Sequence, residues 1–95
     1  MSVFAIEYHS YYAYLFYDFS RLTKKRDDGE YAQIDAIAQK YVKMSYDTGG
    51  KRSHHTRNGT SGHIVVHRAY LPALLEELVP VFKKIESAKK RMNTA

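Results

Sequence analysis

The chain has 95 residues, of which 44% are hydrophobic, so it can bury one modest core and we expect a single domain over residues 1–95. The absence of cysteine excludes a disulfide framework, a cysteine-ligated metal centre and a thiol nucleophile. The formal net charge of +5 favours an acidic partner. No cofactor is expected.

The sequence shows no targeting or membrane segment. The first residues include Glu7 and no basic region, which is unlike a secretory signal. The most apolar stretch, residues 11–19, contains four tyrosines and Asp18 and is too short to span a bilayer. We therefore expect a cytoplasmic protein with no membrane partner.

The N-terminal quarter is dominated by aromatic residues at helical spacing. From about residue 9 this spacing predicts an amphipathic helix, with Tyr14 and Tyr17 on its polar side. Residues 2–8 fit either a helix or a strand, because apolar side chains there also alternate with period two. The apolar arc of about 140° would hold Phe4, Tyr8, Tyr11, Tyr12, Leu15, Phe16, Phe19 and Leu22.

A second helix is predicted after the charged run of residues 24–29. Asp27 or Asp28 is the candidate N-cap. Residues 42–47 continue with alternating apolar and polar side chains, which fits a strand or a last helical turn. The buried stripe of this helix is expected to be Tyr31, Ile34, Ile37, Ala38 and Tyr41.

The second half begins with a glycine-rich basic segment. Residues 48–62 hold four of the five glycines, three cations and no carboxylate, and we expect a long flexible loop with an Asn58-Gly59 hairpin turn. The β-branched run near residues 62–70 predicts a short strand. A last helix follows from Leu71, with a kink at Pro80 and a frayed tail over residues 89–95.

These elements predict an α+β fold that is mainly helical. Its order is two N-terminal helices, a short β element around the long glycine-rich basic loop, and a C-terminal helix.

The cationic excess lies in the second half of the chain, with a net charge of −1 over residues 1–47 and +6 over residues 48–95. Glycines allow close approach to phosphates, and the cations supply charge for them. We therefore expect a non-enzymatic nucleic-acid-binding module. It could serve as a viral or mobile-element inhibitor of a host nucleic-acid machine. The candidate binding residues are Lys51, Arg52, His54, His55, Arg57, Arg68, Lys83, Lys84, Lys89, Lys90 and Arg91.

The tyrosine-rich segment suggests a second function class, a protein-interaction module. Tyr14 and Tyr17, on the polar side of the predicted first helix, are the candidate partner surface. A chain this short is expected to cover its surplus aromatic rings by forming a homodimer.

The histidines do not predict a metal site. On a strand, His63 and His67 share a face about 13 Å apart, too far to chelate one ion. The adjacent His54 and His55 would point in opposite directions, and no carboxylate lies within six residues of them. Surface or phosphate-contacting histidines are the simpler interpretation.

A metal-independent endoribonuclease is the alternative, with His54 or His55 transferring protons beside Lys51 and Arg52. The run from Arg52 to His55, followed by residues 62–67 and a helix, resembles the HicA-type messenger-RNA-cleaving toxins, which carry a Gly-Ser-His-His motif on a double-stranded-RNA-binding-like fold. The resemblance implies that His54 is catalytic. It covers only about residues 41–80, and Arg52 stands in place of the motif's glycine, so it does not assign the family.

Overall fold

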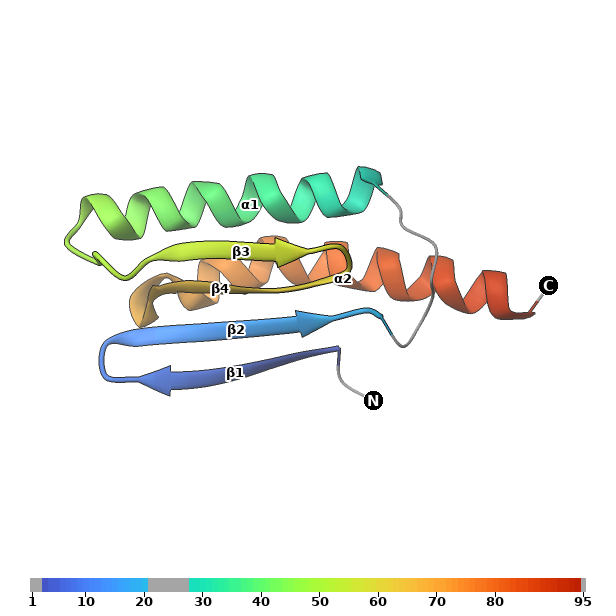
Figure 1. The fold of residues 1–95 in the computed structure, drawn as a ribbon, viewed down its shortest axis with the longest axis horizontal. Coiled ribbons are helices and arrows are strands. Elements are labelled where there is room, and N and C mark those ends of the chain that lie inside the picture. Colours follow the sequence, from blue (N-terminus) through green and yellow to red (C-terminus); the bar gives the residue numbers. More distant parts are fainter. Residues whose placement is uncertain (1–2, 21–27, 95) are drawn as a thin grey trace.

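The computed structural model describes residues 3–20 and 28–94, with side chains described over 3–20 and 29–87. The described elements are β1 (Phe4–His9), β2 (Tyr12–Asp18), α1 (Asp28–Asp47), β3 (His54–Asn58), β4 (Ser61–His67), a 3-10 turn (Arg68–Tyr70) and α2 (Leu71–Thr94). The four strands form one antiparallel sheet in the order β1-β2-β4-β3 (Figure 1). None of the helices in the described part of the chain is both long enough and apolar enough to cross a membrane.

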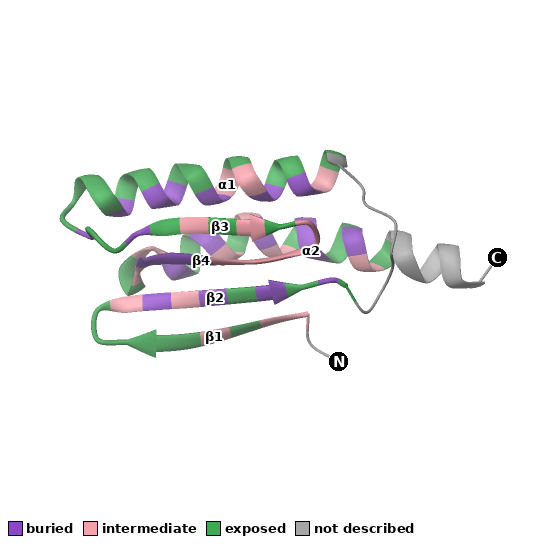
Figure 2. Ribbon diagram, in the orientation of Figure 1, coloured by how far each residue is buried: buried purple, intermediate pink, exposed green. Residues whose placement is uncertain are grey.

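Both helices pack on the same face of the sheet. Alternate residues of β2 and β4 point into the layer between sheet and helices and are fully buried there, together with the apolar stripes of α1 and α2. Figure 2 shows the buried positions on the sides of the helices that face the strands. The largest buried side chains of this core are Leu15, Phe19, Tyr31, Ile34, Ile64, Leu74, Leu78 and Phe82.

The two helices are also joined to each other by a polar cluster. Lys40 on α1 donates a hydrogen bond of 2.6 Å from Nζ to Oε1 of Glu77 on α2, and the Tyr41 hydroxyl donates to the other oxygen of the same carboxylate. These two bonds hold the pKa of the Glu77 carboxyl below its usual value. The helix layer is thereby fixed as one unit behind the sheet.

The predicted order of two N-terminal helices is wrong, because residues 4–18 form the β1–β2 hairpin. Aromatic side chains occupy most positions from 11 to 19, so helical and extended periods fit equally, and the high strand propensity of tyrosine and phenylalanine decides for the extended form. Tyr8 and Tyr11, predicted in the buried arc, are 55% and 70% exposed. Tyr17, predicted on the polar side, is buried. The strand alternative for this segment is confirmed from Phe4 onward by β1.

The segment 48–62 is likewise more structured than a long loop. It contains β3 and the turn to β4, in which Asn58 pairs with Ser61 and the central residues are Gly59 and Thr60. Gly59 has a φ of 65°, as the first central residue of a type II′ turn requires, so the predicted Asn58-Gly59 turn is displaced by one residue. Glycine is also required at Gly62, since a Cβ there would lie 2.6 Å from the Tyr17 hydroxyl.

The remaining elements agree with the sequence. The expected stripe of α1 is buried except for the half-buried Ile37, and the helix continues to Asp47, which settles residues 42–47 as helical. The strand after Gly62 and the helix from Leu71 are confirmed, and α2 continues through Pro80. Asp27 and the side chains of Asp28 and of the expected frayed tail lie outside the described residues.

The turn of the β1–β2 hairpin supplies a test of this fold. Ser10 has a φ of 58°, in the left-handed region that favours glycine. We therefore expect Ser10→Gly to increase the free energy of unfolding by about 0.5–1 kcal/mol. In the helix predicted from the sequence, the same substitution would destabilise by roughly 0.5 kcal/mol. Urea denaturation of the wild type and Ser10→Gly measures the difference in their free energies of unfolding. An increase in the variant supports the hairpin, and a decrease would contradict it.

Candidate nucleic-acid interface

The face of the sheet turned away from the helices, which we call the open face, has no layer packed on it by any of the described residues. Its members follow from the pairing register, because residues opposite each other in an antiparallel sheet point to the same side. Tyr14, for example, lies opposite Glu7 on β1 and Val65 on β4, while its neighbours Ala13 and Leu15 are buried under the helices. The open face comprises Ala5, Glu7, His9, Tyr12, Tyr14, Phe16, Asp18, His54, Thr56, Asn58, Ser61, His63, Val65 and His67.

Five rings form a continuous band across the open face, with at least one from every strand. In sequence of contact they are His9, Tyr14, Phe16, His63 and His54, and we call them the ring band. Successive ring centroids are 4.9, 6.3, 5.8 and 5.1 Å apart. Val65, central on the same face, is fully buried although no helix covers that side. The side chains around it therefore shield it from solvent, while Phe16 itself remains 38% exposed.

Three cations gather at the end of the sheet where the β1–β2 turn meets the end of β4. Only Arg52 lies against a ring of the open face, because Tyr8 pairs with Ala13 and so points to the helix side, and Tyr46 belongs to α1. The guanidinium of Arg52 lies 5.9 Å from the ring centroid of Tyr12, and that of Arg68 lies 4.9 Å from the ring of Tyr8. Lys51 lies 4.5 Å over the ring of Tyr46. All three cations are exposed. We call Lys51, Arg52 and Arg68 the cationic end.

A buried serine pair holds the cationic end in place. The Ser53 hydroxyl donates to the Ser45 hydroxyl at 2.6 Å, and the His67 backbone N–H donates to the same oxygen at 2.8 Å. The N–H of Gly50 donates to the carbonyl of Ser45 at 2.8 Å, where a Cβ on that glycine would collide with the serine. The segment that carries Lys51 and Arg52 is thus fastened between α1 and β4.

Strand alternation divides the predicted loop site between the two faces of the sheet. His54 lies on the open face, whereas His55 and Arg57 point toward α1. Arg57 donates two hydrogen bonds to the Asp35 carboxylate, at 2.7 and 2.8 Å, which lower the pKa of that carboxyl. The Tyr17 hydroxyl is 2.9 Å from Nε2 of His55, whose side chain is 9% exposed. Arg57 and His55 therefore serve packing, and the buried Tyr17 cannot form the partner surface expected for it.

The other candidate residues do not form one surface. Lys83 and Lys84 are exposed on α2, behind the sheet. The side chains of Lys89, Lys90 and Arg91 lie outside the described residues. The structure thus brings together Lys51, Arg52, His54 and Arg68, and adds Tyr14 from the proposed protein surface. Among the residues the structure describes, no three histidine or acidic side chains form a group that could hold a metal.

Sequence reasoning named Tyr14 and His54 as candidate site residues but missed the other three rings of the ring band, His9, Phe16 and His63. The usable signal was the alternation in β2, where Ala13, Leu15 and Tyr17 form one face and Tyr12, Tyr14 and Phe16 the other. The interpretation of the segment as helix hid this division. The shared face of His63 and His67, and the opposite directions of His54 and His55, were predicted correctly from strand geometry.

Comparison with known proteins gives no match: no family model, no curated protein and no solved structure is similar to this chain. The resemblance of residues 41–80 to the HicA-type toxins is accordingly not supported by a family match. The open face and the cationic end are the observations on which a function can be argued.

The buried His55 predicts a pH dependence of stability. Burial lowers the pKa of His55 below its ordinary value, since the charged ring loses hydration and Arg57 opposes a second positive charge, although Asp35 acts in the other direction. Between that lowered value and about 6.5 the unfolded chain binds more protons than the folded one. The free energy of unfolding should therefore decrease as the pH falls from 7 to 5.

Urea denaturation at pH 7, 6 and 5 measures this slope, which cannot exceed about 1.4 kcal/mol per pH unit for one proton. We expect His55→Gln to reduce the slope, since glutamine does not titrate and can still bond the Tyr17 hydroxyl. His9→Gln, which removes an exposed histidine, is the matched control. Equal slopes in the wild type and His55→Gln would show that the buried ring is not the source.

Proposed function

We propose that the protein binds single-stranded nucleic acid on the open face of its sheet. Bases stack on the ring band, and the cationic end contacts the phosphates of the strand. The observation that carries the proposal is the ring band itself, which lies on a sheet face that no described element covers. One-sided antiparallel sheets ordinarily present polar side chains to water, so a connected row of rings there indicates a partner with flat apolar surfaces.

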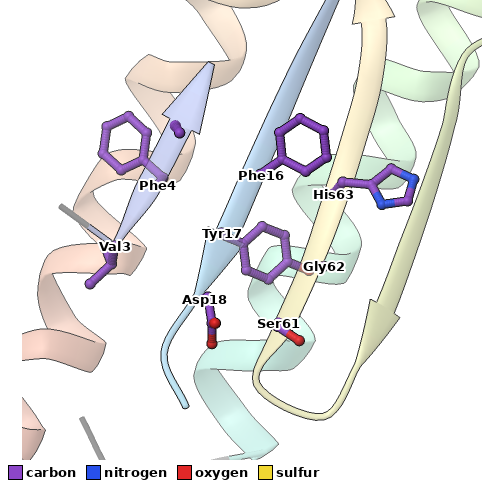
Figure 3. A pocket seen from close by; sticks show the side chains of 9 residues that line it. Val3, Phe4, Phe16, Tyr17, Asp18, Ser61, Gly62 and His63 are labelled. Atoms are coloured by element: carbon purple, nitrogen blue, oxygen red, sulfur yellow. The ribbon is translucent and has the colours of Figure 1, made fainter. Parts of the chain in front are cut away.

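The surroundings of Phe16 suit a base. Beside its ring the small side chain of Ala5 leaves an open depression of about 550 Å³, closed on the other side by His63. Figure 3 shows Phe16 and His63 side by side on neighbouring strands at this depression. Stacking against an aromatic ring tolerates any base, because every base has a π face. The geometry supports binding without strong sequence preference.

The position of the charges favours a single strand over a duplex. A duplex keeps its base faces stacked inside and exposes only phosphates, sugars and base edges, so it offers no base face to the ring band. Lys51, Arg52 and Arg68 lie at one end of the sheet, whereas the ring band crosses all four strands. A strand laid across this face therefore meets rings along its bases and cations at one end of its path.

Fluorescence anisotropy with a labelled oligothymidylate tests the role of the rings. Phe16→Ala should weaken binding by about 5- to 150-fold, corresponding to about 1–3 kcal/mol for one stacked base. Phe16→Tyr keeps a ring and should bind nearly as the wild type does. Met44→Ala removes another exposed apolar side chain, on α1, and is the control. Unchanged affinity in Phe16→Ala would contradict the proposal.

A second experiment tests the cationic end. Replacing Lys51, Arg52 and Arg68 with glutamine should lower affinity and reduce the slope of log K against log salt by roughly 0.7 per lost phosphate contact on a single strand. The Lys83→Gln, Lys84→Gln double variant removes charge from the helix side and should alter both quantities much less. Equal effects per charge in the two variants would show that binding follows net charge and not the open face.

The ribonuclease alternative has one structural observation in its favour, the 3.0 Å contact between Nε2 of His54 and Nε2 of His63. One imidazole would remove the proton of a 2′-hydroxyl, whose oxygen attacks the adjacent phosphorus. An imidazolium would protonate the departing 5′-oxygen and leave a 2′,3′-cyclic phosphate. Cleavage of RNA that is lost in both His54→Ala and His63→Ala would establish this activity, and intact RNA would exclude it.

The homodimer expected from the sequence would compete for the same face. A second copy seated on the ring band would cover Phe16, so Phe16→Ala would dissociate such a dimer. Light scattering at tens of micromolar, with and without oligothymidylate, separates the cases. A dimer that persists when the oligonucleotide is saturating would place the partner surface elsewhere, and a dimer with no nucleic-acid affinity would overturn the proposed function.

A further inference from the structure

The two contacting histidines of the ring band, His54 and His63, form a hydrogen-bonded pair with fixed proton positions. Nδ1 of His54 is 2.7 Å from the carbonyl oxygen of Arg52. A carbonyl can only accept, so Nδ1 carries the hydrogen and Nε2 of the neutral ring is an acceptor. His63 must then donate from its own Nε2 across the 3.0 Å contact. In the neutral pair these two hydrogen bonds use three of the four ring nitrogens. Nδ1 of His63 remains as an acceptor that a bound strand could use.

A proton added to this pair changes what it can bind. If the proton binds to Nε2 of His54, this N–H faces the N–H on Nε2 of His63 and their hydrogen bond is lost. Both N–H groups could then form hydrogen bonds only with an acceptor placed between the two rings. On Nδ1 of His63 the proton would create a cation with a new N–H. Either place adds one positive charge and one donor to the open face. A phosphate oxygen supplies both the negative charge and the acceptor lone pairs that this state requires.

We infer that the His54–His63 pair is a phosphate subsite of the open face, which takes up a proton when the strand binds. This inference rests on the proposed function. The Phe16 ring lies 5.8 Å from the ring of His63, so a nucleotide stacked on Phe16 has its phosphate within reach of the pair. The cationic end is then not the only place where backbone charge is neutralised.

The groups around the pair favour proton uptake only when an anion arrives. Burial lowers the pKa of His63, and a charge on His54 would lower it further. Behind the sheet, His55 and the Arg57–Asp35 ion pair face α1. The carboxylates of the open face are engaged elsewhere: Glu7 lies 3.9 Å from His9, and Asp18 accepts from the backbone N–H of Ser20. The neutral form of His63 is therefore its resting state near pH 7.

The sign of the linkage follows. Because binding takes up a proton, affinity must increase as the pH falls toward the pKa of the pair, by at most about tenfold per pH unit for one proton. Reciprocally, a bound strand must raise the pKa of the pair. His67, on the same face, provides the contrast because its Nδ1 already accepts from the backbone N–H of Ala69.

The test measures both sides of this linkage with oligothymidylate, which has no 2′-hydroxyl and so cannot be cleaved by transesterification. We expect the wild-type Kd to fall by about fivefold or more between pH 7.5 and 5.5, and by less than about twofold in His54→Gln and His63→Gln. His67→Gln should respond as the wild type does. In the wild type, imidazole ¹⁵N shifts should show the pKa of His54 or His63 rise by about one unit at saturation.

The outcomes separate the two proposals. Wild-type protein that fails to bind the oligonucleotide at low salt would overturn the proposed function and the subsite with it. If the protein binds the oligonucleotide tightly but Kd changes with pH to the same extent in the wild type, His54→Gln and His63→Gln, the phosphate subsite is overturned. The proposed function would stand in that case. Unaltered imidazole shifts in the wild type, which need no variant to fold, would do the same.

Discussion

The coverage of the sheet on one side only is the constraint from which the other features follow. Two hairpins supply four strands, and each hairpin is followed by one helix. The two helices share a single apolar layer with one sheet face and are tied together through Glu77. Among the described residues no further element remains to cover the second face. The rings on that face, Phe16 among them, are therefore presented at least partly to solvent, in an array set by the strand register, while Val65 is buried beneath its neighbours.

Rigidity distinguishes this surface from a basic loop. Main-chain pairing fixes the spacing of Tyr14, Phe16, His63 and His54, and the buried serine pair fixes the segment that carries Lys51 and Arg52. On the opposite side of β3, the Asp35–Arg57 ion pair fastens the edge strand to α1. A surface that is ordered before binding loses little conformational entropy when a strand is laid on it. Charge alone would attract the same strand without orienting its bases.

The sequence predicts the second half of this fold better than the first. The α1 stripe is readable because apolar residues recur at intervals of three and four with polar residues between them, and β4 is readable from its β-branched run. Residues 11–19 are not, since their aromatic and apolar side chains fit the helical and the extended period equally. The turn at Ser10 also lacks a glycine or asparagine signal, because its positive φ is adopted by a serine.

The functional site was predictable only in part for the same reason. Lys51, Arg52 and His54 were found from composition, because glycines and cations cluster in one segment. Composition cannot tell His54 from His55, which the two-residue period of β3 sends to opposite faces. Phe16 and His63 are 47 positions apart, and only the pairing of β2 with β4 brings them together. Contacts between residues so far apart in the sequence depend on which strands pair in the sheet, and no local sequence pattern predicts that pairing.

The central claim is that the open face, and not the helix side, receives a nucleic-acid strand. Backbone amide shifts of the ¹⁵N-labelled protein, followed during titration with oligothymidylate, measure this directly. The account predicts that the largest changes fall on residues 12–16, 51–54 and 63–68, while Lys83 and Lys84 on α2 are unaffected. Changes confined to α2, or no change at millimolar oligonucleotide in low salt, would contradict it.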